Sequence, residues 1–178
     1  MVRDGYPYIV HPLMDGVPRV DPRLLEAWTD WAEATGLARD ATLLVAPEAM
    51  ALPLAAALAL RTRVPYVVVR KRAYDLPGEE TAVARTGYGG ATLHLNDVAA
   101  DDRVLVVDDV LSTGGTLGSV LEAIRRRGAG VLGALVFLDK GDAAAALRER
   151  FAVPVQAMRR VAVDGGRVRV VPSADAGP

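Results

Sequence analysis

The most informative segment of this chain runs from Val104 to Thr116 and reads VLVVDDVLSTGGT. Its first four residues are apolar and predict a buried strand, and the two carboxylates that follow stand at the C-terminal end of that strand. A loop of hydroxyl and glycine residues then leads into a segment with helical periodicity. Because ligands of open α/β sheets bind at the carboxyl ends of the strands, we expect the binding site at this turn.

The loop has the composition of a phosphate-binding nest. It can direct consecutive backbone N–H groups and two hydroxyls at one anion, and the following helix adds the positive end of its dipole. A phosphate monoester fits such a nest, and we expect Gly114→Val to abolish binding because a side chain would fill it. Asp108 and Asp109 would repel that phosphate, so they must face something else a few ångströms away, for which ribose hydroxyls or a magnesium ion are natural choices.

Other sequence motifs fit this segment less well. A Walker A loop needs a lysine, and none follows Gly115. The dinucleotide fingerprint needs the spacing G-x-G-x-x-G, which Gly114, Gly115 and Gly118 do not provide. A response-regulator receiver also pairs carboxylates at a strand end, but without a following Thr-Gly-Gly-Thr. The remaining alternative is a plain strand-to-helix turn that the aspartates cap.

The rest of the chain alternates between short β-branched runs and longer helical segments, which predicts an α/β fold with a mainly parallel sheet. We expect strands at residues 42–46, 66–70, 104–108 and 131–138, and helices from Asp21 to Gly36 and at 53–61, 116–127 and 142–150. Residues 72–90 contain several glycines and predict a long mobile loop. Residues 155–163 and 167–171 flank Asp-Gly-Gly and predict a hairpin. Residues 1–178 are interpreted as one domain, with 172–178 as a frayed tail.

Composition excludes several classes of protein. The 178 residues carry a formal charge of −1 and no cysteine, which excludes a disulfide scaffold and argues against a general nucleic-acid surface. The longest apolar stretch, residues 49–60, is too short to span a membrane, and the N-terminus lacks a signal-peptide core, so we place the chain in the cytoplasm. Lys71 and Lys140 are the only lysines among 21 basic residues.

The segment from Val104 to Thr116 resembles the phosphoribosyl-pyrophosphate (PRPP) motif of type I phosphoribosyltransferases. The resemblance extends over about residues 5–171, where the chain is similar to archaeal-type hypoxanthine phosphoribosyltransferases, relatives of the adenine enzymes. The segments that carry it are YPYIVHP (6–12), DGVP (15–18), PEAM (47–50), VRKR (69–72), LPGE (76–79) and TGY (86–88).

The resemblance implies the type I phosphoribosyltransferase fold: a mainly parallel central sheet flanked by helices, with a small N-terminal hood and a mobile loop. It implies purine salvage, in which PRPP and a purine base give a nucleotide and pyrophosphate with Mg²⁺ as cofactor, in a homodimer without nucleic-acid or membrane partners. Asp108 and Asp109 would then be the catalytic residues that contact the ribose hydroxyls or their magnesium shell. The residues that would hold the 5′-phosphate are Ser112, Thr113, Gly114, Gly115 and Thr116.

The resemblance also implies a pyrophosphate site. Its residues would be Pro47, Glu48, Ala49, Arg70 and Lys71, and the Ala46–Pro47 peptide is a candidate for the strained or cis bond found in this loop of the family. A plain proline turn and a solvated basic strand end are the structural alternatives. The loop at 72–90 would close over the site and exclude water, and Glu79, Glu80 and Arg85 on it are expected in solvent.

For the base, the resemblance favours a 6-oxopurine, hypoxanthine or guanine. Lys140 would donate to O6, and Phe137 or a hood at residues 8–15 would cover the ring; a surface salt bridge and ordinary core packing are the alternatives. Adenine enzymes carry a Glu-Tyr pair where this chain has Gly87-Tyr88. His11 is a candidate base contact, whereas His94 lies in an alternating stretch that predicts exposure on an edge strand.

Three rival functions stay open: adenine as the base, another acceptor such as orotate or xanthine, and a PRPP-sensing regulator that has lost catalysis. Archaeal regulators of that kind carry a helix-turn-helix segment ahead of the domain, and here the domain begins almost at Met1. The triplet Arg125-Arg126-Arg127 is interpreted as a helix C-cap rather than a DNA contact.

Overall fold

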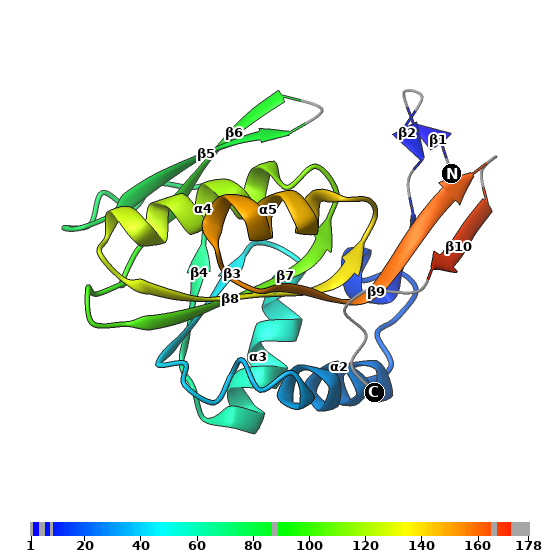
Figure 1. Ribbon diagram of the computed structural model, residues 1–178, viewed down its shortest axis with the longest axis horizontal. Helices are drawn as coiled ribbons and strands as arrows, with labels where there is room; N and C mark the ends of the chain where they lie inside the picture. The colour runs from blue at the N-terminus through cyan, green and yellow to red at the C-terminus, as the bar shows by residue number, and fades with distance from the viewer. Residues whose placement is uncertain (1, 4–5, 8, 87–88, 165–166, 172–178) are drawn as a thin grey trace.

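A six-stranded sheet with helices on both faces forms the centre of the molecule (Figure 1). The computed structural model describes residues 2–3, 6–7, 9–86, 89–164 and 167–171. The strand order is β10-β9-β8-β7-β3-β4. The strands of this sheet are β3 (Leu43–Pro47), β4 (Tyr66–Val69), β7 (Arg103–Leu111), β8 (Gly130–Asp139), β9 (Val155–Asp164) and β10 (Arg167–Val171).

Five of these strands are parallel, and β10 pairs antiparallel with β9. Their carboxyl ends therefore meet at one edge: Pro47 is in register with Val69, and Leu111 with Asp139. The predicted strands, helices and C-terminal hairpin are all confirmed, with shifts of a few residues at their ends. The proposed tail at 172–178 lies outside the described residues.

The helices form two layers because alternate residues of each strand face opposite sides of the sheet. One layer holds α4 (Gly115–Arg126) and α5 (Ala143–Phe151), and the other holds α1 (Pro12–Asp15), α2 (Pro22–Ala34) and α3 (Ala51–Thr62) (Figure 1). Val104 and Val106 of β7 are buried in the core beneath α4, whereas Leu105 and Val107 are buried in the core beneath α2 and α3. No helix of the described residues is long and apolar enough to cross a membrane.

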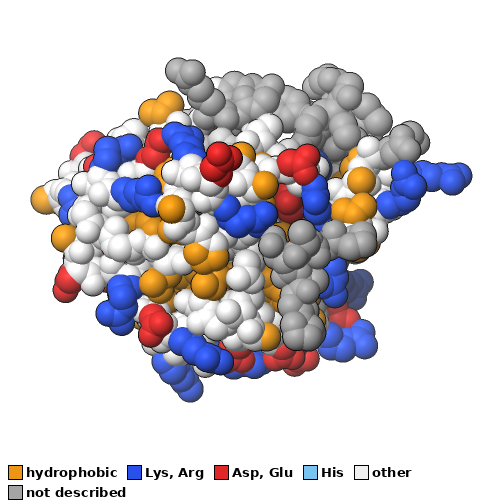
Figure 2. Space-filling view, viewed as in Figure 1, with side chains coloured by type: hydrophobic (Ala, Val, Ile, Leu, Met, Phe, Trp, Pro, Cys, Tyr) orange, Lys and Arg blue, Asp and Glu red, His pale blue; other side chains and the backbone are white. Residues whose placement is uncertain are grey.

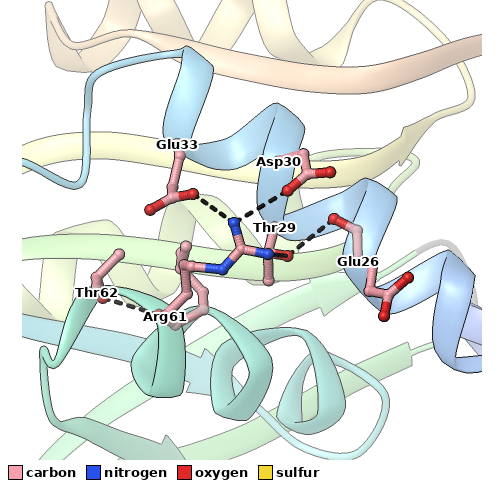
Figure 3. A network of polar contacts seen from close by, with 7 residues as sticks. Glu26, Thr29, Asp30, Glu33, Arg61 and Thr62 are labelled. Atoms are coloured by element: carbon pink, nitrogen blue, oxygen red, sulfur yellow. Dashed lines mark hydrogen bonds and ion pairs between the residues drawn. The ribbon is translucent and has the colours of Figure 1, made fainter.

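A polar network joins α2 to α3 on the outer side of their layer. The guanidinium of Arg61 reaches from α3 to Asp30 at 3.0 Å, Glu33 at 2.7 Å and the Thr29 hydroxyl at 3.3 Å (Figure 3). Deeper in the interface, the indole N–H of Trp28 donates to the Leu54 carbonyl at 3.2 Å. Polar and apolar contacts together therefore fix α2 against α3.

The structure corrects the prediction of a long loop at residues 72–90. Much of that region is an antiparallel hairpin of β5 (Glu80–Thr86) and β6 (Gly89–Leu95), which packs on α4. Ala82 and Ala84 of β5 and Leu93 of β6 are buried in the same core as α4. These inward-facing residues are mostly small, so their alternation is a weak strand signal in the sequence. The loop is confined to residues 70–79, and a further short pair, β1 (Val2–Arg3) with β2 (Tyr6–Pro7), precedes α1.

Candidate active site

The loop between β7 and α4 has the geometry of an anion-binding nest. Gly114 caps α4 in the left-handed conformation, with φ 78° and ψ 0°, and the Gly115 N–H makes a long hydrogen bond of 3.5 Å to the Thr113 hydroxyl. The N–H of Gly118 bonds to the Gly114 carbonyl at 2.8 Å, which starts the helical ladder. The amides of the first turn and the positive end of the helix dipole are thus available to an anion.

Gly114 is required here for a different reason from the one predicted. A Cβ built on Gly114 would lie 3.3 Å from Cβ of Ala143 and 3.3 Å from Cδ1 of Leu147, so it would point at α5 and not into the nest. The expectation that a side chain would fill the nest is therefore wrong. The positive φ and the close packing of α5 exclude larger residues instead.

Asp108 and Asp109 are adjacent within β7, which continues to Leu111, so they lie near the C-terminal end of the strand and not at it as predicted. Asp108 is buried at 6% exposure, and one of its oxygens accepts the Asp109 N–H at 2.9 Å. Burial raises the pKa of Asp108 well above its ordinary value, and the adjacent Asp109 charge adds to the effect. Burial also raises the pKa of Asp109 to about 6, with a contribution from the charge of Asp15. Such a pair gains from hydroxyl donors or a cation.

The donor set fits magnesium held jointly with a substrate. The described residues contain no group of three or more His, Cys, Asp or Glu side chains placed to hold a metal ion. Two adjacent carboxylates are nevertheless suitable, because Mg²⁺ commonly binds through one or two carboxylates together with water and substrate phosphate oxygens.

The residues assigned to pyrophosphate come together where β3 and β4 end side by side. Oε1 of Glu48 accepts the Lys71 N–H at 2.7 Å, and its Oε2 lies 3.1 Å from Nε of Arg70 in an ion pair that lacks hydrogen-bond geometry. The cis peptide of this loop is Glu48–Ala49, so the assignment to Ala46–Pro47 is wrong. The sequence gives no signal for this cis bond, because the residue that follows it is alanine and cis bonds are otherwise found almost only before proline.

Glu79 and His94 occupy a buried cluster that the sequence did not indicate. Glu79 accepts the Tyr74 N–H at 2.9 Å and the Asn96 amide at 2.8 Å, and Nδ1 of His94 lies 3.1 Å from its other oxygen. Their side chains are 11% and 15% exposed, so the expectation of solvent exposure is wrong for both. The hydrogen bonds from Asn96 and the Tyr74 amide lower the pKa of Glu79. The cluster closes the 70–79 loop onto β6.

Glu80 is also less exposed than expected. Its carboxylate bonds to Nε of Arg126 at 2.7 Å, and its side chain is 25% exposed. The side chain of Arg85 lies outside the described residues.

The residues that we predict to contact the base lie near the C-terminal ends of β7 and β8. Phe137 is 7% exposed and stacks on the imidazole of His11, with ring centroids 4.8 Å apart. It also packs among the core residues beneath α2 and α3, which is the core-packing alternative; its contact with the base stays a prediction. The N–H of Lys140 donates to the Leu111 carbonyl at 2.8 Å, which places Lys140 beside the end of β7. Tyr8 and the Gly87-Tyr88 pair lie outside the described residues.

The arginine triplet at the C-terminus of α4 does more than cap the helix. Arg125 donates to the Phe151 carbonyl, Arg126 binds Glu80 and the Thr81 carbonyl, and Arg127 donates to the Val98 carbonyl. Each side chain thus ties α4 to a different segment. On the face drawn in Figure 2, the described basic and acidic side chains are interspersed, in accord with the charge of −1.

Comparison with known proteins agrees with this geometry. A model of the phosphoribosyl transferase domain matches residues 23–159. The chain belongs to the phosphoribosyltransferase family. It is 42% identical over 97% of its length to the hypoxanthine/guanine phosphoribosyltransferase of Methanothermobacter marburgensis, of which 90% is covered. It is 37% identical over 95% of its length to the enzyme of that name from Methanocaldococcus jannaschii, of which 92% is covered.

Solved structures support the fold. The adenine phosphoribosyltransferase of Thermoanaerobacter pseudethanolicus aligns with a TM-score of 0.65 at 25% identity, over 79% of this chain and 82% of that one. The Giardia lamblia enzyme gives a TM-score of 0.68 at 23% identity, over 78% of this chain and 80% of that one. The predicted type I phosphoribosyltransferase architecture, with its mainly parallel central sheet, is confirmed.

Proposed function

We propose that this protein is a purine phosphoribosyltransferase of nucleotide salvage, which transfers the 5-phosphoribosyl group of PRPP to a 6-oxopurine and releases pyrophosphate. The observation that carries the proposal is the junction of β7 and α4, where a glycine-capped helix start follows the buried Asp108 and the half-buried Asp109 after a loop of a few residues. The relatives named hypoxanthine/guanine phosphoribosyltransferase, which match over nearly the whole chain, support the choice of base.

The nest and the acid pair would hold the two ends of the sugar. Ser112, Thr113 and the amides from Gly114 to Thr116 bind the 5′-phosphate, while Asp108 and Asp109 accept the ribose hydroxyls or bind the Mg²⁺ that accompanies PRPP. When bound, magnesium would neutralise part of the negative charge of pyrophosphate. With the sugar fixed, the nearby carboxylates stabilise the positive charge that develops at C1 as the bond to pyrophosphate breaks.

Arg70 and Lys71, with the Pro47–Glu48–Ala49 loop beside them, would receive the departing pyrophosphate. The two cations lie next to the loop where β3 ends, and Lys71 is exposed. Charge-assisted hydrogen bonds from two cationic side chains suit an anion with several negative oxygens. The loop at 71–78, which is exposed, would cover this end of the site.

Lys140 and Phe137 would contact the base. An ammonium donates to the O6 acceptor of hypoxanthine or guanine but meets only donors on the 6-amino group of adenine. Adenine is the second candidate, because solved structures with this fold include adenine phosphoribosyltransferases at 25% identity. We also expect a homodimer that works in the cytoplasm.

The test is incubation of the purified protein with PRPP, Mg²⁺ and a panel of bases, followed by detection of pyrophosphate. We expect faster turnover of hypoxanthine and guanine than of adenine, orotate or xanthine. Faster turnover of adenine would overturn the assignment of the base. Binding of PRPP without turnover of any base would instead favour a catalytically silent regulator.

A further inference from the structure

His11 is held in one defined orientation at the start of α1. Its ring Nδ1 accepts the backbone N–H of Leu13 at 3.2 Å, and the backbone N–H of His11 donates to the Asp15 carboxylate at 2.9 Å. Its ring lies against Phe137 with an interplanar angle of 30°. His11 is therefore held by its backbone N–H, and its imidazole is held at one ring nitrogen and across one ring face.

These contacts also fix the protonation state of the ring. A backbone N–H can only donate, so Nδ1 must carry a lone pair, and the hydrogen of the neutral ring is on Nε2. Burial lowers the pKa of His11, which favours the neutral form. In this state the ring has no free lone pair on Nε2, so it is a hydrogen-bond donor and not a general base.

The position of α1 brings this donor to the site. Helix α1, which His11 caps, packs against β7, the strand that carries Asp108 and Asp109. Phe137, on which the imidazole stacks, follows Val136, which is in register with Asp108. The imidazole thus lies beside the carboxyl ends of β7 and β8, on the side where Lys140 follows β8.

We propose that His11 is a specificity-determining residue whose Nε2–H donates to O6 of the purine base. This inference rests on the proposed function and adds a second donor to Lys140. A 6-oxopurine presents two adjacent acceptors, O6 and N7, on one edge, whereas adenine presents an amino donor beside N7. Two donors at this end of the sheet therefore favour the 6-oxopurine.

Two variants separate hydrogen bonding from packing. His11→Asn keeps a side chain that caps helices well but removes the ring and its Nε2–H. His11→Phe keeps an aromatic ring against Phe137 but removes both nitrogens. Asp21→Asn is the matched control, because Asp21 also caps a helix that begins with proline and accepts an N–H two residues later.

The measurement is kcat/KM for hypoxanthine, for purine, which lacks O6, and for 7-deazahypoxanthine, which lacks N7. We expect both His11 variants to lose about tenfold or more with hypoxanthine, as for one good hydrogen bond, with an unchanged KM for PRPP and little change in the Asp21 control. The loss should disappear with purine and persist with 7-deazahypoxanthine, and the reverse pattern would overturn the role in specificity. An equal loss with all three bases would overturn the inference and show a structural role. Absence of turnover by the unmodified protein with every base would overturn the proposed function instead.

Discussion

Glu48 places a carboxylate oxygen 3.1 Å from the Nε of Arg70, in the site that we assign to pyrophosphate. A carboxylate in an anion site repels the ligand. The other carboxylate oxygen of Glu48, however, accepts the backbone N–H of Lys71. Glu48 thus holds the backbone at Lys71 and pairs with the Arg70 guanidinium before the substrate binds, and its charge opposes tight retention of the product. This balance suits a site that must release pyrophosphate in every cycle.

Glu48→Gln should therefore strengthen the binding of pyrophosphate. The amide keeps an oxygen for the Lys71 N–H but removes the negative charge, so we expect the inhibition constant of pyrophosphate to fall about three- to tenfold, an effect limited by solvent screening at Arg70. Product-inhibition kinetics measure it. Arg70→Gln is the opposite control and should weaken the inhibition. Weaker pyrophosphate binding in Glu48→Gln would contradict the role of its charge.

Replacement of the carboxylates should stabilise the protein without ligand and remove its activity. The ordinary pKa of an aspartate is 3.8, and that of Asp109 is raised to about 6. Between these values the folded state binds more protons than the unfolded state, so the free energy of unfolding falls as the pH rises from about 4 to about 6. Asp109→Asn removes this cost, and we expect about 1–3 kcal/mol of added stability at pH 7.5.

Denaturant unfolding at several pH values measures this effect, together with turnover. We expect Asp108→Asn and Asp109→Asn to flatten the pH dependence and to lower turnover by orders of magnitude. Unchanged stability of Asp109→Asn at pH 7.5 would contradict burial as the cause of the raised pKa. Near-normal turnover of both variants would contradict their role at the ribose.

Much of this site could be predicted because its signals are local. The strand, the acid pair and the nest are contiguous between Val104 and Thr116, and parallel strands bring the neighbouring strand ends to the same edge. The partial burial of Glu79 and His94 could not be predicted, because it depends on a contact between residues fifteen positions apart at the open end of the β5–β6 hairpin. The atoms that a side chain at position 114 would meet could not be predicted either, because they belong to α5, which packs there from a distant part of the chain.

Gly114→Ala should destabilise the junction of α4 and α5. The positive φ and the 3.3 Å approach to Ala143 and Leu147 disfavour a methyl group, so we expect a loss of about 1–3 kcal/mol in the free energy of unfolding. Gly141→Ala is the control, because its Cβ would meet the Ser112 carbonyl oxygen at 3.9 Å, an ordinary contact. Thermal unfolding compares the two. Equal stability of both variants would contradict the packing argument.

Glu79→Ala should loosen the 70–79 loop without affecting the central sheet. It removes the acceptor of the Tyr74 N–H and of the Asn96 amide, so we expect faster hydrogen exchange at the Tyr74 amide and unchanged exchange in β7. Glu122→Ala, which breaks a surface pair with Arg150, is the matched control and should leave Tyr74 unchanged. Unaltered protection at Tyr74 in Glu79→Ala would show that this carboxylate does not hold the loop.

The arginines at the end of α4 have a consequence for the evolution of the site. One helix, about 18 Å long, begins at the phosphate nest and ends where Arg126 holds the β5–β6 hairpin. The phosphate nest and the anchor of the hairpin thus belong to one helix. A hairpin grafted from another family member would lose its contacts with Arg126 unless residue 126 were transferred with it. Engineering of the β5–β6 hairpin should therefore treat residues 80–95 and 114–127 as a single exchangeable module.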